Sequence, residues 1–283
     1  MWGWSNESPE KAEEHAREIA KETRTKNDEQ DIPLREDIIE EFSEHLYTRN
    51  ESGAICLSTS TVGMTEINFY NEAPVRYKRY ALITLITVSL IFLLLSPLLP
   101  VEWAFFGMLF IIASYPAVQA LIWKLVLRQD GGQEGYFLKK LDEFLHQNPD
   151  WIVDTYRTPR GLNYIIMHDI FSPKDPEILG WLKQTQTRPA DIRFAQKYHL
   201  FRLKISPEPM DLGIEPLAQM HWPDLNAAEK QETSEWINSY NALSAQTANL
   251  FFLKRMGPYS GTEILHPNAL AIKHAYEVRA IKP

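Results

Sequence analysis

The chain has 283 residues, with 37 acidic and 29 basic side chains, and its formal net charge is −8. A single cysteine, Cys56, excludes an internal disulfide and a zinc site built from several cysteines, and it suits a reducing compartment. A chain this acidic is not expected to bind nucleic acid.

The acidic residues are concentrated in the first quarter of the chain. Residues 1–75 hold 17 acids and 7 bases, a net charge of −10, whereas the other 208 residues hold 20 acids and 22 bases, a net charge of +2. We therefore expect residues 1–75 to form an acidic cytoplasmic region that an anionic membrane surface repels and that can dock on a basic partner.

Within this region the local patterns predict two helices and then extended structure. Capping residues and favourable charge pairs predict a helix over residues 8–25, and an apolar stripe at helical spacing predicts a second one over residues 31–50. The stripe consists of Ile38, Ile39, Phe42 and Leu46. Residues 54–70 alternate between apolar and Ser or Thr side chains, which predicts short extended segments with a break at Gly63.

Two long apolar runs follow and predict a transmembrane helical hairpin over residues 76–128. Ala81–Leu99 has 19 residues without a charge and Trp103–Trp123 has 21. As helices these runs reach about 28 and 31 Å, which is close to the thickness of the hydrocarbon core of a bilayer.

The flanking charges predict the orientation of this hairpin. Basic residues precede the first run and follow the second, while the connection between the runs carries only Glu102; the basic residues are Arg76, Lys78, Arg79, Lys124 and Arg128. Because Lys and Arg near the ends of a span stay on the cytoplasmic side, we expect two spans in the inner (plasma) membrane with both termini in the cytoplasm.

The composition of the two runs argues against a transporter. Neither run carries an ionisable side chain, and such side chains usually mark ion or proton pathways. Pro116 is expected to kink the second helix, because it lacks a backbone donor. Ala113, Ala117 and Ala120 form a face of small residues, which suits either a packed anchor or a pore built from several copies.

The remaining residues, 129–283, are predicted to form a cytoplasmic α+β domain. Three glycines within residues 131–135 predict a hinge. Helical patterns follow over residues 137–145, 176–183 and 190–198, and strand-like runs lie at 151–156, 162–167 and 200–205. The first two of these strand-like runs are separated by a turn and predict a β-hairpin.

The last part of the chain begins with a capping box. Asn226 and Glu229 have the spacing of this motif and predict a long helix that ends near Met256, with a final short helix or strand over residues 269–281. Mixed helices and strands favour a small antiparallel sheet covered on one face, and a ferredoxin-like arrangement is the expected fold.

Two segments of this domain resemble a group of uncharacterised bacterial proteins. They are the YRTPRGL segment of residues 156–162 and the FRLKISPEP segment of residues 201–209. The resemblance covers about residues 136–283 and implies a shared domain without an assigned reaction. Related sequences often place a basic residue and a Trp around the second proline of the later segment, where this chain has Glu208 and Met210.

The same segments carry the candidate binding residues. Residues 155–205 contain nine bases and four acids, a net charge of +5 in an otherwise acidic chain. If the strands around residues 156 and 202 are neighbours, their side chains can bind a phosphate, a carboxylate or a partner surface; the candidates are Tyr156, Arg157, Arg160, Arg202 and Lys204. The structural alternative is that Arg157 pairs with Asp154 or Asp169 across the sheet.

A metal or hydrolytic site is a second hypothesis for this domain. His168, Asp169 and His199 have side chains that bind divalent ions, but their spacing matches no established metal or nucleophile motif. No cofactor is expected.

The sequence therefore predicts a membrane-anchored cytoplasmic binding or scaffold protein, more plausibly a binding module than an enzyme. Its expected partners are the lipid bilayer, another protein or further copies of the chain, and an anionic ligand. The alternatives are a membrane-tethered phosphate-handling hydrolase or nuclease that uses Arg157, Arg202, His168 and Asp169, and an effector that oligomerises in the membrane.

Overall fold

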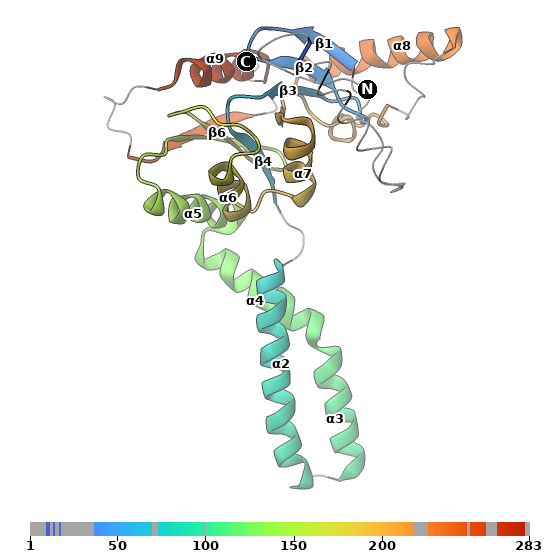
Figure 1. The fold of residues 1–283 in the computed structure, drawn as a ribbon. Coiled ribbons are helices and arrows are strands. Elements are labelled where there is room, and N and C mark those ends of the chain that lie inside the picture. Colours follow the sequence, from blue (N-terminus) through green and yellow to red (C-terminus); the bar gives the residue numbers. More distant parts are fainter. Residues whose placement is uncertain are drawn as a thin grey trace. The chain divides into compact units, whose positions relative to one another are not determined.

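The computed structural model describes residues 10, 11, 14, 17, 37–69, 73–98, 100–217, 226–247, 250–258 and 265–280, and the structural statements below concern these residues. The chain divides into two compact units (Figure 1). Unit 1 comprises residues 1–68 together with 141–283, and unit 2 comprises residues 69–140. Unit 2 is thus inserted into the sequence of unit 1.

Unit 1 contains two four-stranded antiparallel sheets. Sheet A has the order β1 (Asp37–Glu41), β2 (Leu46–Arg49), β3 (Ile55–Thr59) and β7 (Phe201–Lys204). Sheet B has the order β4 (Met64–Asn68), β6 (Gly161–Ile166), β5 (Val153–Thr158) and β8 (Phe251–Met256). The edge strand β4 of sheet B contacts the edge strand β7 of sheet A. The two sheets therefore adjoin at this point.

Helices complete unit 1 around these sheets. They are α5 (Gly132–Gln147), which begins in unit 2, α6 (Pro176–Gln184), α7 (Pro189–Tyr198), the 3-10 helix η2 (Pro209–Leu212), α8 (Ala227–Ser244) and α9 (Pro267–Ala280). Helix α9 is bonded to both sheets: the Tyr47 hydroxyl of β2 donates to the carbonyl of Ala275 at 3.0 Å, and Lys273 forms an ion pair with Asp154 of β5 at 2.9 Å. The core is rich in aromatic side chains, and Trp181, Tyr164, Tyr276 and Phe201 are almost fully buried.

Much of the predicted secondary structure of unit 1 is confirmed. Strands β3 and β4 lie on either side of Gly63, β5 and β6 form the hairpin, and α6, α7 and β7 occur where they were predicted. The capping box at the start of α8 is present, because the Asn226 side chain accepts from the amide of Glu229 and the Glu229 side chain accepts from the amide of Asn226. The final element is a helix, α9.

The predicted helix over residues 31–50 is wrong. Residues 37–41 and 46–49 form strands β1 and β2, with a tight turn between them in which the amide of Phe42 donates to the carbonyl of His45 at 2.8 Å. All four residues of β2 are buried, so both faces of this strand are covered. Burial on both faces of a strand hides the alternation that distinguishes a strand from a helix in sequence.

The glycine hinge and the end of α8 also differ from the prediction. Gly131 and Gly132 adopt positive φ, but α5 begins at Gly132 and continues through Gly135. A Cβ atom at Gly135 would lie 1.7 Å from the carbonyl oxygen of Asp130, so this glycine permits a close turn between two helices. Helix α8 ends at Ser244, and residues 251–256 pair with β5 as strand β8.

The domain organisation is also different from the expectation. Residues 37–68 were expected to belong to a separate N-terminal region, but β3 pairs with β7 and β4 pairs with β6, so they share both sheets with the later part of the chain. The two adjoining sheets replace the ferredoxin-like arrangement that we expected. Of the helix predicted over residues 8–25, the structure describes Glu10, Lys11, Glu14 and Arg17, which are helical, and the rest lies outside the described residues.

Unit 2 is built from long apolar helices. They are α2 (Val75–Leu95), which continues into the 3-10 helix η1 (Ser96–Leu98), α3 (Val101–Ala113) and α4 (Tyr115–Gln129). Of the helices in the described residues, one, Val75–Leu98, is by itself long and apolar enough to cross a membrane, and α3 and α4 meet that test only as a bent pair. The angle between α3 and α4 is 46°, and Pro116 stands at the start of α4. The predicted kink is therefore confirmed.

Helices α2 and α3 lie side by side (Figure 1). A Cβ atom added at Gly107 would lie 2.4 Å from Cζ of Phe92, so the absence of a side chain on α3 makes room for an aromatic ring of α2. Further along, the Tyr115 hydroxyl of α4 donates to the carbonyl of Lys78 at 3.4 Å. The rings of Tyr77 and Trp123 are 5.4 Å apart near the ends of α2 and α4.

Candidate functional site

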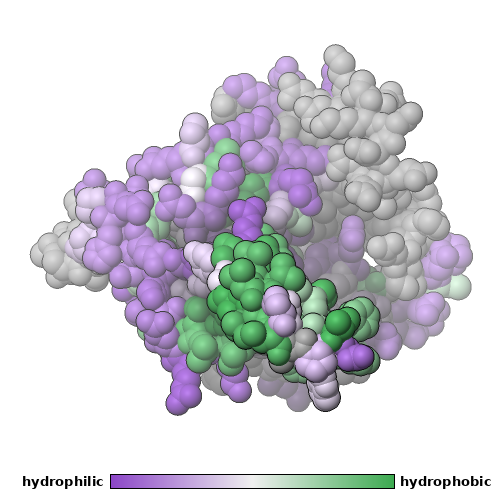
Figure 2. Space-filling view, turned by 90° about the horizontal axis from the view of Figure 1, so that it is seen from below, coloured by the Kyte–Doolittle hydropathy of each residue, from purple (hydrophilic) through white to green (hydrophobic). Residues whose placement is uncertain are grey.

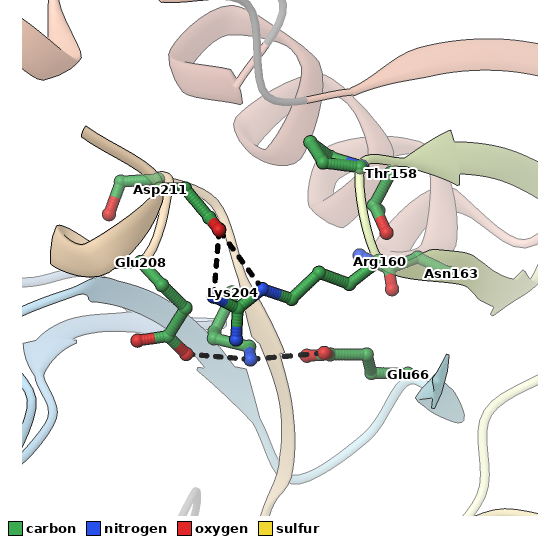
Figure 3. A pocket seen from close by; sticks show the side chains of 9 residues that line it. Glu66, Thr158, Arg160, Asn163, Lys204, Glu208 and Asp211 are labelled. Carbon is green, nitrogen blue, oxygen red and sulfur yellow. Dashed lines mark hydrogen bonds and ion pairs between the residues drawn. The ribbon is translucent and has the colours of Figure 1, made fainter. Parts of the chain in front are cut away.

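The two sequence segments that we singled out meet in a group of ionised side chains, which we call the charged cluster: Glu66, Arg160, Lys204, Glu208 and Asp211. Lys204 lies in β7 and Glu66 lies in β4, at the point where the two sheets adjoin. Arg160 comes from the turn between β5 and β6, and the two remaining acids come from the segment after β7 (Figure 3).

Every member of the charged cluster has a partner of opposite charge. Nζ of Lys204 is 3.0 Å from Oε1 of Glu66 and 2.8 Å from Oε1 of Glu208, and Figure 3 shows the ammonium group between these two carboxylates. Oε2 of Glu208 also accepts from the Ser52 hydroxyl at 2.7 Å. Arg160 donates to Oδ1 of Asp211 through Nη2 at 2.7 Å and through Nε at 3.2 Å.

The electrostatics of the cluster follow from this pairing. Burial alone would lower the pKa of Lys204, but the carboxylates of Glu66 and Glu208 outweigh burial and raise that pKa. Burial alone would raise the pKa of Glu208, but the hydrogen bond and charge of Lys204, with the Ser52 hydroxyl, hold it below its usual value. Lys204 and Glu208 thus stay ionised near neutral pH.

The cavity at the charged cluster is small. Its volume is about 20 Å³, which suits a water molecule or a small ion and is too small for a nucleotide or a sugar. With three carboxylates against two cations, the net charge of the cluster is −1. An incoming phosphate would have to displace carboxylates that are already bonded to the cations.

Tyr156 does not offer a surface on which a base could stack. Its side chain is fully buried, and its hydroxyl donates to Oε1 of Glu277 at 2.8 Å and accepts from Nζ of Lys273 at 2.9 Å. Burial, followed by the hydrogen bond to Glu277, raises its pKa far above the usual value of a tyrosine. Tyr156 therefore stabilises the contact between β5 and α9.

Arg157 holds the turn of the β5–β6 hairpin. Its Nη1 donates to the carbonyl of Thr158 and, at 2.9 Å, to the carbonyl of Gly161. Asp154, which we considered as its partner, is instead bonded to Arg255 at 2.5 and 2.8 Å and to Lys273 at 2.9 Å.

Arg202 lies on a different sheet from Arg157. Sheet A contains β7 and sheet B contains β5, so the condition under which these residues could share a ligand, neighbouring strands, is not met. The guanidinium of Arg202 lies 4.0 Å from the ring centroid of Phe194, over a second cavity of about 20 Å³ that Thr65 and Thr187 also line. The five candidate residues for anion binding therefore do not converge on one ligand position.

The three candidate metal ligands have structural roles. Nδ1 of His168 accepts from the amide of Ile152 at 3.2 Å, and burial lowers its pKa. Asp169 accepts from the amide of Ile170 at 2.8 Å, and His199 ends α7 in the left-handed conformation with φ 54°. Within the described part of the chain, no group of three or more His, Cys, Asp or Glu side chains could hold a metal ion.

The three acids of the charged cluster could not be recognised from the sequence as partners of Arg160 and Lys204. Glu66 is far from Lys204 in the chain and reaches it only because β4 adjoins β7. Glu208 and Asp211 follow the basic segment directly, as the N-cap and a residue of η2, and their closeness to Lys204 in the sequence was the one local signal available.

Comparisons with protein-family models, with curated proteins and with solved structures gave no match for this chain. The resemblance to uncharacterised bacterial proteins therefore stays a prediction.

Proposed function

We propose that this protein is a membrane-anchored scaffold in which unit 2 spans the bilayer and unit 1 binds a protein partner on the cytoplasmic side. The observation that carries this proposal is the apolar surface of unit 2. From Leu82 to Leu98, no described residue of α2 or η1 is buried, and α3 has no buried residue at all. Seen from below, the hairpin that lies lowest in Figure 1 presents an almost continuous hydrophobic surface (Figure 2).

The lengths of the helices support two crossings. The uncharged part of α2 and η1, residues 81–98, rises about 27 Å. Helix α3 alone has 13 residues and rises only about 20 Å. The first eight residues of α4 add about 12 Å along a direction tilted by 46°, or about 8 Å along α3, so the bent pair also rises about 28 Å.

The flanking charges support a cytoplasmic position for unit 1. Both ends of unit 2 that connect to unit 1 carry the basic residues, whereas the opposite end of the helices carries one charged residue, Glu102 in the first turn of α3. By the positive-inside rule, both parts of unit 1 then lie in the cytoplasm.

The side chains of unit 1 favour a binding role over catalysis. The cations of the charged cluster are paired, and the four residues named for a hydrolase or nuclease each contact a different set of neighbours.

Among the described residues of unit 1, five of the ten exposed large apolar side chains lie on or next to the outer strands β1 and β8. These five are Ile38, Ile39, Phe42, Phe251 and Phe252. Apolar side chains beside an outer strand suit a polypeptide partner more than a phosphate.

Alkaline extraction of membranes from cells that express the full-length protein tests the anchor. We expect the protein to stay in the membrane pellet and the double variant Ile86→Arg/Leu90→Arg to be released, because two buried charges oppose insertion. A matched double variant in unit 1, Ile170→Arg/Met210→Arg, should stay in the pellet. Release of the unaltered protein would contradict the proposal.

Affinity purification in detergent tests the scaffold. A stoichiometric protein partner that is lost from Ile38→Ser/Phe42→Ser would support it. Release of a dye trapped in liposomes by the purified protein alone would instead support the oligomerising effector.

A further inference from the structure

Unit 2 carries a set of basic residues at one end of its helices, which we call the basic collar: Arg79, Lys124 and Arg128. Arg79 follows the first turn of α2, and the other two lie in the second half of α4. The contact between Tyr77 and Trp123 shows that the start of α2 and this part of α4 lie at the same level. The collar therefore lies on α2 and α4, close to the points where the uncharged stretch of the hairpin begins and ends.

The cations of the collar are not neutralised within the described chain. All three side chains are exposed, and none of them forms an ion pair with a described residue. The nearest acid in sequence, Asp130, is bonded to Lys139 at 2.7 Å and is thus already paired. This is the opposite of unit 1, where buried and half-buried cations are paired with carboxylates.

Aromatic side chains lie at the same level. Arg76 donates to the hydroxyls of Tyr77 and Tyr136, the latter at 3.1 Å, and Trp123 lies 5.1 Å from the ring centroid of Tyr136. Tyr and Trp are the residues that favour the boundary between headgroups and acyl chains. This places the collar at headgroup depth when the apolar part of the hairpin contacts acyl chains.

We propose that the basic collar binds the headgroups of anionic phospholipids, so that the hairpin selects such lipids as its immediate neighbours. The inference rests on the proposed membrane span. A cation held at the headgroup level attracts an anionic phosphate that lacks a compensating ammonium group, and this preference amounts to about five-fold per exposed Lys or Arg.

The test uses full-length protein in nanodiscs that contain equal amounts of phosphatidylglycerol and phosphatidylcholine. The protein is released gently, and the phospholipids that it retains are identified by native mass spectrometry. We expect phosphatidylglycerol to be enriched several-fold among the retained lipids. The variant Arg79→Gln/Lys124→Gln/Arg128→Gln should lose most of this enrichment, whereas Arg79→Lys/Arg128→Lys should keep it.

A matched control removes three exposed cations that have no ion-pair partner among the described residues of unit 1, through Lys174→Gln/Lys183→Gln/Arg193→Gln. This control should retain phosphatidylglycerol like the unaltered protein. Equal loss of preference in the control would overturn the assignment to the collar. Unaltered protein that enters the nanodisc but retains both lipids equally would overturn the inference and leave the span intact, whereas protein that does not enter at all would contradict the proposed function itself.

Discussion

Units 1 and 2 use their polar groups in opposite ways. In unit 1, charged side chains bind partners that are distant in the sequence, such as Asp154 with Arg255 and Lys204 with Glu66. In unit 2, the hydroxyls of Thr84 and Thr87 donate to carbonyls four residues earlier in the same helix, and the cations at its end are exposed. The comparison teaches that long-range ion pairs assemble unit 1, whereas the apolar part of α2 satisfies its hydroxyls within the helix and leaves its apolar side chains exposed.

The largest effect should come from the buried carboxylate of Asp154. Asp154→Ala leaves Arg255 and Lys273 without their shared partner, and we expect a loss of about 3–5 kcal/mol in the free energy of unfolding. Urea denaturation of the full-length protein in detergent, followed by tryptophan fluorescence, measures this loss. The exposed acid Asp150 is the control, and Asp150→Ala should change the free energy by less than about 0.5 kcal/mol. Equal effects of the two variants would show that unit 1 does not depend on this ion pair.

A smaller loss is expected at the turn between β5 and β6. A Cβ atom at Gly161 would lie 1.8 Å from the carbonyl oxygen of Ile67, so Gly161→Ala must push β4 away from β6 and should cost about 2–3 kcal/mol in the same measurement. Gly180 lies within α6 and has no atom within 4 Å of an added Cβ. Gly180→Ala should therefore stabilise the protein by about 0.5–1 kcal/mol. A neutral Gly161→Ala variant would contradict the close approach of these strands.

The contact between Phe92 and Gly107 tests whether unit 2 has a specific interior of its own. Gly107→Ala brings a methyl group against the Phe92 ring and should lower the thermal unfolding midpoint, with a cost of about 1–2 kcal/mol. Adding Phe92→Ala relieves this contact, so the double variant should lose less stability than the sum of the two single variants. Additive losses would show that the two helices do not pack at this point.

The smallest effect should appear in the dependence of stability on pH. The pKa of Glu208 is lowered in the folded protein, so its contribution is present above the unfolded pKa and is lost as the pH falls through the folded pKa. The pKa of Lys204 is raised, so its contribution is present below its unfolded pKa and is lost as the pH rises through the folded pKa. Glu208→Gln should reduce stability at pH 7 by about 1 kcal/mol and flatten the decline of stability on the acid side of pH 4.5. If the decline of stability below pH 4.5 is the same in Glu208→Gln, then Glu208 does not contribute to the stability of unit 1.

The contrast between the units also explains what could be predicted from the sequence. The apolar runs of unit 2 and the kink at Pro116 were predictable, because helices bond within themselves and a proline breaks them at a known position. The β5–β6 hairpin and the capping box of α8 were predictable for the same reason, since the groups that bond are a few residues apart.

The pairings that define unit 1 were not predictable in this way. Strand β2 is buried on both faces, so its sequence does not alternate between apolar and polar residues. Residues 251–256 form the strand β8 because they pair with β5, a partner that is distant in the sequence. The candidate site failed for a related reason. A count of charges over residues 155–205 suggested an anion site, but the fold pairs two of these cations, Arg160 and Lys204, with the acids Glu66, Glu208 and Asp211.

The insertion of unit 2 between β4 and β6 sets an order of events during synthesis. Strand β4 ends at Asn68, and its partner β6 begins at Gly161, after α2, α3 and α4. At typical translation rates the ribosome needs about 5 to 20 s to make the intervening residues. During that interval β4 still lacks its partner strand, so unit 1 completes its sheets only after the whole of unit 2 has been made. In the membrane-anchored scaffold that we propose, unit 1 would therefore finish folding on a chain that the bilayer already holds.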